Sequence, residues 1–373
     1  MSRTDLRRLI AIATAAFSLR AGAAVLTEFK PLFPAYYYTD AEFADREARA
    51  SLAAAAHDER RDVAYSFAQR AHIRFTAALY RVAGPRPLAP KLCNAFAAAL
   101  GVLAFGTWAA AVFGASAGLI AAGLLALWPS HVFYTSQNFK EGLICAALMG
   151  ALWLCRPGRT AAAAALLAVL AVLRAPAALA AAAALAAPAA WTFLRPRRAA
   201  AGLALALTFA AVAVAAAHWT PSEITAQRRY RQYSEHLYAV GLGREIGTLL
   251  FPDERFGSWL DVAAFVPKAS FHVLFMPLPG LYPMDGKAGR YLAAAENSLL
   301  LILFALAVAS VARGGISPER MSPLLFFALM TAASSLLEFD LGGAGRHKLM
   351  YLPMLFPFAA EEALRLVRAR RNA

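Results

Sequence analysis

The chain consists mainly of long apolar stretches, separated by short polar turns and by two long polar segments. The apolar stretches approach the roughly 20 residues with which a helix crosses the hydrocarbon core of a membrane. We therefore predict an all-α polytopic protein, a single integral membrane domain over residues 1–373. About ten spans are predicted, near 8–27, 92–112, 115–133, 139–155, 160–174, 176–194, 199–218, 291–312, 322–338 and 349–366.

The two long polar segments are loops at 28–91 and 219–290, and both carry helix-start signals. Residues 39–42 and 220–223 fit capping boxes, in which a hydroxyl and a carboxylate satisfy the free N–H groups at a helix start. The pattern predicts a helix along the membrane surface in each loop. The stretch 265–280 is apolar with helix breakers at both ends, and we predict a loop or re-entrant segment there.

Composition supports a membrane protein, because 60% hydrophobic and 16% charged residues leave too little polar surface to enclose 373 residues as a soluble globule. The formal net charge is +14, but no helix-turn-helix or RNA-binding motif accompanies it, so we expect no nucleic-acid partner. We interpret the positive charge in two ways: basic residues orient the protein in the membrane, and they attract an anionic ligand.

Histidines and cysteines show no spacing that is typical of a metal site. Cys93, Cys145 and Cys155 fall inside apolar stretches and are interpreted as small core residues, without a disulfide framework. His131 and His272 are interpreted as residues of the membrane interface. We predict no cofactor, and the sequence does not indicate a divalent metal.

The basic residues define an orientation, since cytoplasmic turns are enriched in Lys and Arg. With the N-terminus inside, the short cytoplasmic segments hold Arg3, Arg7, Arg8, Arg156, Arg159, Arg195, Arg197, Arg198, Arg313, Arg320, Arg365, Arg368, Arg370 and Arg371. The short outside turns hold only Lys140, Arg174, Arg346 and Lys348. The predicted topology is therefore N-in and C-in, with both long loops outside the cytoplasmic membrane.

The first span has two open interpretations. Arg7, Arg8 and the small residues at 21–23 also fit a cleavable signal peptide, which leaves the following loop on the same side. Arg20 lies inside the apolar segment, where it needs a protein partner or an aqueous cavity, or else snorkels to the interface.

Polar residues at the outer ends of spans are the candidates for function, because unpaired charge near lipid is costly. They are Asp40 after the first span, Lys140 and Glu141 at the start of the fourth, Arg174 in the turn between the fifth and sixth, and Arg346, His347 and Lys348 at the start of the tenth. The predicted topology places all of them outside. A carboxylate opposite several cations suits transfer from a phosphate leaving group, which needs a base for the acceptor and positive charge for the phosphate.

The order of these pieces resembles that of bacterial GT-C glycosyltransferases of the protein mannosyltransferase and aminoarabinose transferase kind, which use polyprenyl-phosphate sugars. Residues 38–48 resemble their first outer loop, where an Asp after the first span begins a juxtamembrane helix. Residues 128–143 resemble their Pro-Ser, aromatic, then basic-plus-acidic pattern, and 342–353 resemble the basic cluster before a proline at their last span. The resemblance covers most of the chain.

The resemblance implies that Asp40 is the catalytic base and that the basic residues contact the lipid phosphate. The implied phosphate contacts are Lys140, Arg174, Arg346, His347 and Lys348, with Glu42 and Glu141 as candidate accessory acids. The implied activity is inverting transfer of a hexose or pentose from a polyprenyl-phosphate donor to a lipid, glycan or protein acceptor outside the bacterial inner membrane. Many members of that family carry two adjacent acids in the first outer loop, whereas Ala41 separates Asp40 from Glu42 in this chain.

Other functions stay open from the residues alone. A lipid-linked glycan flippase or other transporter would place charges or prolines in the middle of several spans, where this chain is almost wholly apolar apart from Arg20. A surface-glycan polymerase or ligase would concentrate acidic and basic groups in one late loop, whereas here the acid lies in the first. A non-catalytic membrane scaffold is a further alternative.

Overall fold

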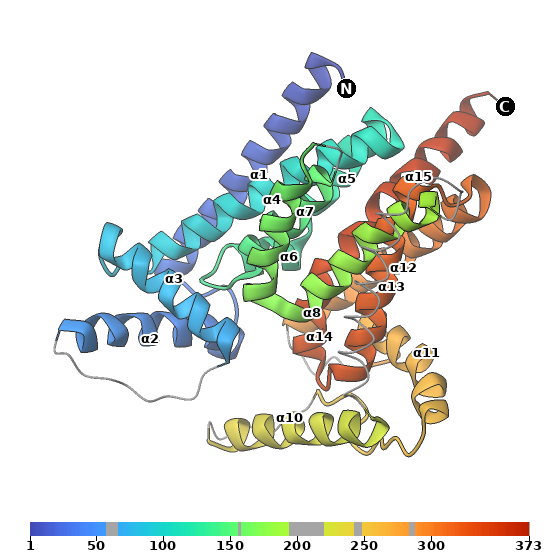
Figure 1. Cartoon of the computed structure of the whole chain (residues 1–373). Coiled ribbons are helices and arrows are strands. Elements are labelled where there is room, and N and C mark those ends of the chain that lie inside the picture. Colours follow the sequence, from blue (N-terminus) through green and yellow to red (C-terminus); the bar gives the residue numbers. More distant parts are fainter. Residues whose placement is uncertain (57–65, 156–157, 194–219, 242–247, 283–287, 373) are drawn as a thin grey trace. The chain divides into compact units, whose positions relative to one another are not determined.

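A computed structural model describes residues 1–56, 66–155, 158–193, 220–241, 248–282 and 288–372 of the chain (Figure 1). The regular secondary structure of these residues is helical, apart from one isolated antiparallel bridge between Leu249 and Asp340. The all-α prediction is therefore confirmed. The span predicted near 199–218 lies outside the described residues.

The chain forms two compact units, the first of Met1–Ala181 with Phe356–Ala373, and the second of Ala182–Leu355. The first contains α1 (Arg3–Phe29), η1 (Ala35–Tyr37), α2 (Thr39–Ala56), α3 (Phe67–Ala83), α4 (Leu88–Phe113), α5 (Ala115–Leu127), α6 (Pro129–Thr135), α7 (Glu141–Leu154), the start of α8 (Thr160–Phe193) and α15 (Phe356–Arg371). The second contains α10 (Pro221–Gly241), α11 (Trp259–Phe275), α12 (Ala288–Gly314), α13 (Pro318–Leu337), α14 (Leu341–His347), η2 (Lys348–Met350) and η3 (Leu352–Leu355).

Helix α4 is the centre of the first unit, since it packs against α1, α5 and α7. Small residues allow the close approach. A side chain on Gly101 would collide with Cys145 of α7, and one on Gly118 of α5 would collide with Ala110 of α4. Small residues at such contacts are typical of helix packing within membranes.

Five helices among the described residues are long and apolar enough to cross a membrane: α1, α4, the stretch Thr160–Pro188 of α8, α12 and α13. The number reaches six if α5 and α6, which are bent by 59° at their junction, count as one span. The structure thus supports an all-α membrane protein, while the expected count of ten spans is not confirmed. Helix α7 is apolar but only 14 residues long.

The bend between α5 and α6 follows from Pro129, the first residue of α6. Proline has no N–H, so the carbonyl of Leu125 loses the partner that a continuous helix would give it. The guanidinium of Arg20 in α1 replaces that partner, donating to the carbonyls of Leu125 at 3.3 Å and Ala126 at 2.9 Å.

Three further hydrogen bonds complete the set around Arg20: to Thr135 Oγ1 at 2.8 Å, to the carbonyl of Ala16 at 3.0 Å and to His131 Nδ1 at 2.8 Å. Because arginine only donates, the neutral His131 ring accepts at Nδ1 and carries its proton on Nε2. Arg20 is 0% exposed and is held by protein groups rather than snorkelling to the interface. His131, which the sequence predicts as a residue of the membrane interface, is buried in this network.

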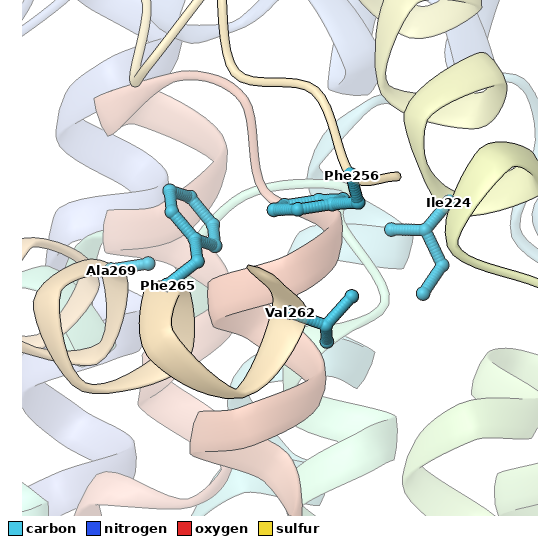
Figure 2. Close-up of a cluster of buried hydrophobic side chains, with 5 residues drawn as sticks. All are labelled: Ile224, Phe256, Val262, Phe265 and Ala269. Atoms are coloured by element: carbon cyan, nitrogen blue, oxygen red, sulfur yellow. The ribbon is translucent and has the colours of Figure 1, made fainter. Parts of the chain in front are cut away.

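In the second unit a cluster of buried side chains joins α10 to α11 (Figure 2). Ile224 comes from α10 and Val262, Phe265 and Ala269 from α11, while Phe256 comes from the loop before it. The rings of Phe256 and Phe265 lie 5.1 Å apart. The helices of the second loop therefore have an apolar core of their own.

Arg228 of α10 fixes this assembly to the end of α13. Its guanidinium donates to the carbonyls of Leu336 at 3.0 Å and Glu338 at 3.2 Å, which end α13 without helical partners. It also donates to the carbonyls of Leu250 at 3.0 Å and Phe251 at 3.3 Å. Burial lowers the pKa of Arg228, and the nearby carboxylates of Glu254 and Glu338 oppose that shift.

Two predictions about local structure are corrected. Residues 265–275 belong to helix α11, because Ser258 and Asp261 form a capping box and Pro267 is accommodated inside the helix. The predicted last span at 349–366 is not one helix: η2 and η3 precede α15, which begins at Phe356. Proline lacks the N–H that an α-helix needs, and Pro353 falls in η3.

The capping box at 220–223 is confirmed, since Glu223 bonds the N–H of Thr220 at 2.6 Å.

Candidate functional site

Asp40 and Glu42, the predicted acids of the first loop, lie in the first turn of α2 and are exposed. Tyr38 fixes the start of this helix, because its hydroxyl accepts hydrogen bonds from the N–H groups of Leu32 at 2.9 Å and Phe33 at 3.2 Å. The chain that leaves α1 is thereby tied to α2. Both carboxylates are open to solvent on a fixed turn of the backbone.

Lys140 and Glu141, the predicted pair of the later turn, lie at the start of α7. Lys140 is its N-cap residue and is half-buried, whereas Glu141 is the first helical residue and is buried. The next N–H, of Gly142, donates to Asn94 Oδ1 at 2.8 Å. Glu141 places negative charge at the positive end of the α7 dipole, which is favourable.

An aromatic cluster brings the two motifs together within the first unit. It contains Tyr38 and Ala41, which flank Asp40, together with Phe133 and Phe139, which precedes Lys140. The rings of Tyr38 and Phe133 lie 5.4 Å apart. Segments a hundred residues apart in the sequence thus meet, with an exposed acid on one and a half-buried cation on the other.

The turn between α6 and α7 is also a platform of buried polar groups. Asn94 Nδ2 donates to the carbonyl of Gln137 at 2.9 Å, and Gln137 Nε2 donates to Thr27 Oγ1 at 3.1 Å. Beside them, Lys91 Nζ and Glu28 form an ion pair at 2.5 Å. This arrangement holds the ends of α1 and α4 to the turn that precedes α7.

Sequence reasoning missed Glu28 and Lys91, although a signal was present. Glu28 is the first acid after the first apolar stretch, and Lys91 is the last cation before the second. Opposite charges at the ends of neighbouring spans are candidates for an ion pair. This ion pair helps to hold the ends of α1 and α4 beside the turn that precedes α7. Its two charges neutralise each other, so we assign it a positioning role.

Helix α3 covers this platform, and α2 packs against α3. His72 Nε2 donates to the carbonyl of Asn138 at 3.2 Å, and the hydroxyl of Thr76 donates to Asn138 Oδ1 at 3.3 Å. Tyr80 of α3 donates to Asp45 of α2, and burial and this carboxylate raise the pKa of Tyr80. The first loop is therefore a helical pair fixed to the membrane helices.

Arg174, a predicted phosphate contact, lies where α8 breaks. Its φ of −161° and ψ of 84° are not helical, so the two arms 160–173 and 175–193 are separate helices in geometry. The sequence predicts a turn between two spans at this residue, and the structure shows a break in α8 there. Arg174 is half-buried and belongs to the first unit.

Arg346, His347 and Lys348 form a group of their own in the second unit, at the end of α14. His347 Nδ1 pairs with Glu338, and both Arg346 and His347 are half-buried. Lys348 is buried: its ammonium donates to the carbonyl of Leu274 at 2.9 Å and to Asn297 Oδ1. Burial lowers the pKa of Lys348 to about 8.

Two acids of this group, Glu338 and Asp340, were missed by sequence reasoning. Asp340 caps α14 by accepting a hydrogen bond from the N–H of Gly343 at 2.7 Å. Burial raises the pKa of Asp340, as does the Glu338 charge, while the Gly343 hydrogen bond and His347 oppose the shift. A signal was available, because Glu338 ends the ninth predicted span, Asp340 follows it, and a glycine-rich segment comes next.

Metal ligands do not gather anywhere in the described part of the chain: no group of three or more His, Cys, Asp or Glu side chains there is placed to hold an ion. The first unit offers an exposed carboxylate, Asp40, and a half-buried ammonium, Lys140, on segments that meet. The second unit offers a histidine held by a carboxylate.

Comparisons with models of protein families and with curated proteins find no match to this chain.

Proposed function

We propose that this protein is a membrane glycosyltransferase, which moves a sugar from a polyprenyl-phosphate donor to an acceptor hydroxyl outside the cytoplasmic membrane. One observation carries the proposal: the segment of Asp40 and the segment of Lys140 meet in the cluster of Tyr38, Ala41, Phe133 and Phe139. A general base and a cation on neighbouring segments are the two groups that such a transfer requires.

In the proposed reaction, Asp40 takes the proton of the acceptor hydroxyl. The acceptor oxygen then attacks the anomeric carbon, a new carbon–oxygen bond forms, and the bond to the lipid phosphate breaks with inversion. The phosphate leaves with the bonding electron pair, and Lys140 stabilises its negative charge. Arg174 contributes further positive charge within the same unit. The roles of Arg346, His347, Lys348, Glu42 and Glu141 rest on the resemblance alone.

The exposure of Asp40 supports a chemical role over a purely structural one. An acceptor must reach the base, and the Asp40 side chain is accessible at the start of α2. The backbone of the turn is held independently, by Tyr38 and by the buried Ala41. Asp40→Asn should therefore change the chemistry without changing the fold.

The test is transfer from a panel of radiolabelled polyprenyl-phosphate sugars in proteoliposomes. The wild-type protein should consume one donor and release polyprenyl phosphate, and Asp40→Asn should be slower by about 100-fold or more, since a general base is worth roughly 10²–10⁴ in rate. Asp253→Asn is the matched control, because Asp253 is an exposed aspartate of the other long loop. It should retain the wild-type rate.

Two outcomes would contradict the proposal. Full activity of Asp40→Asn, with an unchanged melting temperature, would remove Asp40 from the role of base. If the wild-type protein binds a donor but moves it between leaflets with its sugar–phosphate bond intact, the protein is a transporter of lipid-linked glycans and not a transferase.

A further inference from the structure

Helix α3 has an outward face that forms a hollow. Phe67, Arg70, Ala71 and Arg74 line a space of about 390 Å³ on this face. Their spacing of three and four residues places them on one side of the helix. The two guanidinium groups therefore lie beside each other, with an aromatic ring at the same end of the helix.

The opposite face of α3 holds the fold together. Ile73, Ala77 and Tyr80 pack against Ala48 of α2, and His72 and Thr76 bond to the platform below. The side chains of the hollow take no part in these contacts. Arg70 and Arg74 are both exposed, so their charges are available to a ligand.

Three other arginines of the chain have partners in the fold, and Arg70 and Arg74 differ from them. Arg20 and Arg228 bond to backbone carbonyls, and Arg49 pairs with Asp45 at 2.9 Å. Among the described residues, the guanidinium groups of Arg70 and Arg74 have no ion pair and no hydrogen bond. Two cations on one helix face repel each other, and a bound anion would remove that repulsion.

The position of α3 restricts which anion can occupy the hollow. Helix α3 ends at Ala83, and the candidate span α4 begins at Leu88. The hollow therefore lies within ~25 Å of the end of α3, since α3 rises ~1.5 Å per residue, and the span begins five residues after that end. Phe67 is 64% exposed and Val82 is 90% exposed, as expected for a helix with apolar side chains against lipid.

We propose that the face of α3 formed by Phe67, Arg70, Ala71 and Arg74 binds the phosphate of an anionic phospholipid headgroup. The two guanidinium groups donate hydrogen bonds to the phosphate oxygens, a geometry for which arginine is well suited. Phe67 contacts the lipid beside the headgroup. The proposal does not depend on the transferase activity, and it makes α3 an electrostatic anchor of the first loop on the membrane surface.

The test counts lipids bound to the purified full chain by native mass spectrometry, from micelles that contain phosphatidylglycerol or phosphatidylcholine. Wild type should retain phosphatidylglycerol in preference. The pair Arg70→Gln with Arg74→Gln should weaken this binding by about 30-fold, since a basic residue near a lipid surface contributes roughly a fivefold factor or more. Arg70→Lys with Arg74→Lys keeps the charges and should lose less.

The matched control removes two exposed arginines of the other long loop, with Arg229→Gln and Arg255→Gln. It should bind phosphatidylglycerol as wild type does. Raising the salt concentration should weaken phosphatidylglycerol binding of wild type and leave phosphatidylcholine binding unchanged. This salt test needs no variant, so it holds even if a substitution disturbs folding.

Three results would overturn the proposal. The first is equal retention of phosphatidylglycerol by wild type and by the Arg70→Gln, Arg74→Gln protein. The second is binding that is independent of salt or equally strong for phosphatidylcholine. The third is full displacement of the lipid by millimolar inorganic phosphate, which would make the hollow a site for a free anion.

Discussion

Replacing Arg20 by Met tests the reason why the chain keeps a charge inside its first apolar helix. Methionine is of similar length and removes the guanidinium. The change leaves the carbonyls of Leu125 and Ala126 and the Nδ1 of His131 without the donor that they have in the structure. All three acceptors lie near the break between α5 and α6, where lipid and packed helices offer no water.

The magnitude follows from counting the acceptors that lose a partner. A buried acceptor without a partner costs ~1–3 kcal/mol, and hydrogen bonds within membranes lie at the low end of that range. Three acceptors at ~1 kcal/mol each give a loss of ~3 kcal/mol. The substitution also removes the desolvation cost of a buried charge, which offsets part of this loss. We therefore expect Arg20→Met to lose at most ~3 kcal/mol of stability.

The assay is thermal unfolding in one detergent, followed by tryptophan emission. Trp128, one of the six tryptophans of the chain, is buried at the break with its ring 5.3 Å from that of Phe356, so its share of the emission reports on this region. A loss of ~3 kcal/mol lowers the melting temperature by roughly 6–12 °C for a unit of about 200 residues. Leu19→Met is the control, because Leu19 is the neighbouring, exposed residue of α1.

The comparison of three variants separates charge from hydrogen bonding. Arg20→Lys keeps the charge but has fewer donors, so it should fall between wild type and Arg20→Met. If Arg20→Met melts within 1–2 °C of Leu19→Met, the guanidinium does not stabilise the break, and the argument from lost acceptors is refuted.

Two more predictions concern the second unit. Arg228→Met leaves the carbonyls of Leu336, Glu338, Leu250 and Phe251 without their donor, so we expect a loss of ~2–4 kcal/mol and faster proteolysis within α10. The neighbouring exposed Arg229→Met should show neither effect, and equal proteolysis of both variants would contradict the reasoning. Because the pKa of Asp340 is raised from 3.8, the stability that this group contributes is complete below pH 3.8 and is lost as pH rises through the folded-state pKa. Asp340→Asn keeps the helix cap, so it should melt at or above the wild-type temperature at pH 7. The difference between the two melting temperatures should shrink towards pH 4. A lower melting temperature of Asp340→Asn at pH 7 would contradict this prediction.

Local patterns in the sequence predicted the elements that depend on local chemistry. The box at 220–223 works because its two partners are three residues apart, within reach of one helical turn. The box at Ser258 and Asp261 has the same chemistry and would have predicted α11. The helix breakers at both ends of 265–280, Pro267 among them, led to the prediction of a loop instead, because a proline inside a helix is usually a breaker.

The length of an apolar run did not determine the number of spans. The run at 115–133 contains Pro129, and the structure divides it into α5 and α6. The run after Lys348 is buried throughout residues 349–360 but forms short 3-10 turns before α15. Hydropathy measures burial in an apolar environment, and it does not distinguish a lipid-facing helix from a segment that is enclosed by protein.

The polar platform could not be predicted because its partners are far apart in the sequence. Asn138 bonds to residues of α3, and Gln137 bonds to Thr27 more than a hundred positions earlier. No local pattern encodes such pairs. The candidate acids and cations were visible because each stands at the end of an apolar stretch, but their neighbours required the fold.

The environments of the arginines separate structural from binding roles more clearly than their positions do. Arg20 and Arg228 are both buried, and each replaces the donors that a helix end or break removes from backbone carbonyls. A ligand would have to break those bonds to use either charge. Arg70 and Arg74 are exposed and have no hydrogen bond or ion pair to any described residue, so an anion can bind them without such a cost. Among the described residues, Arg70 and Arg74 are therefore better candidates for binding a ligand than Arg20 and Arg228 are.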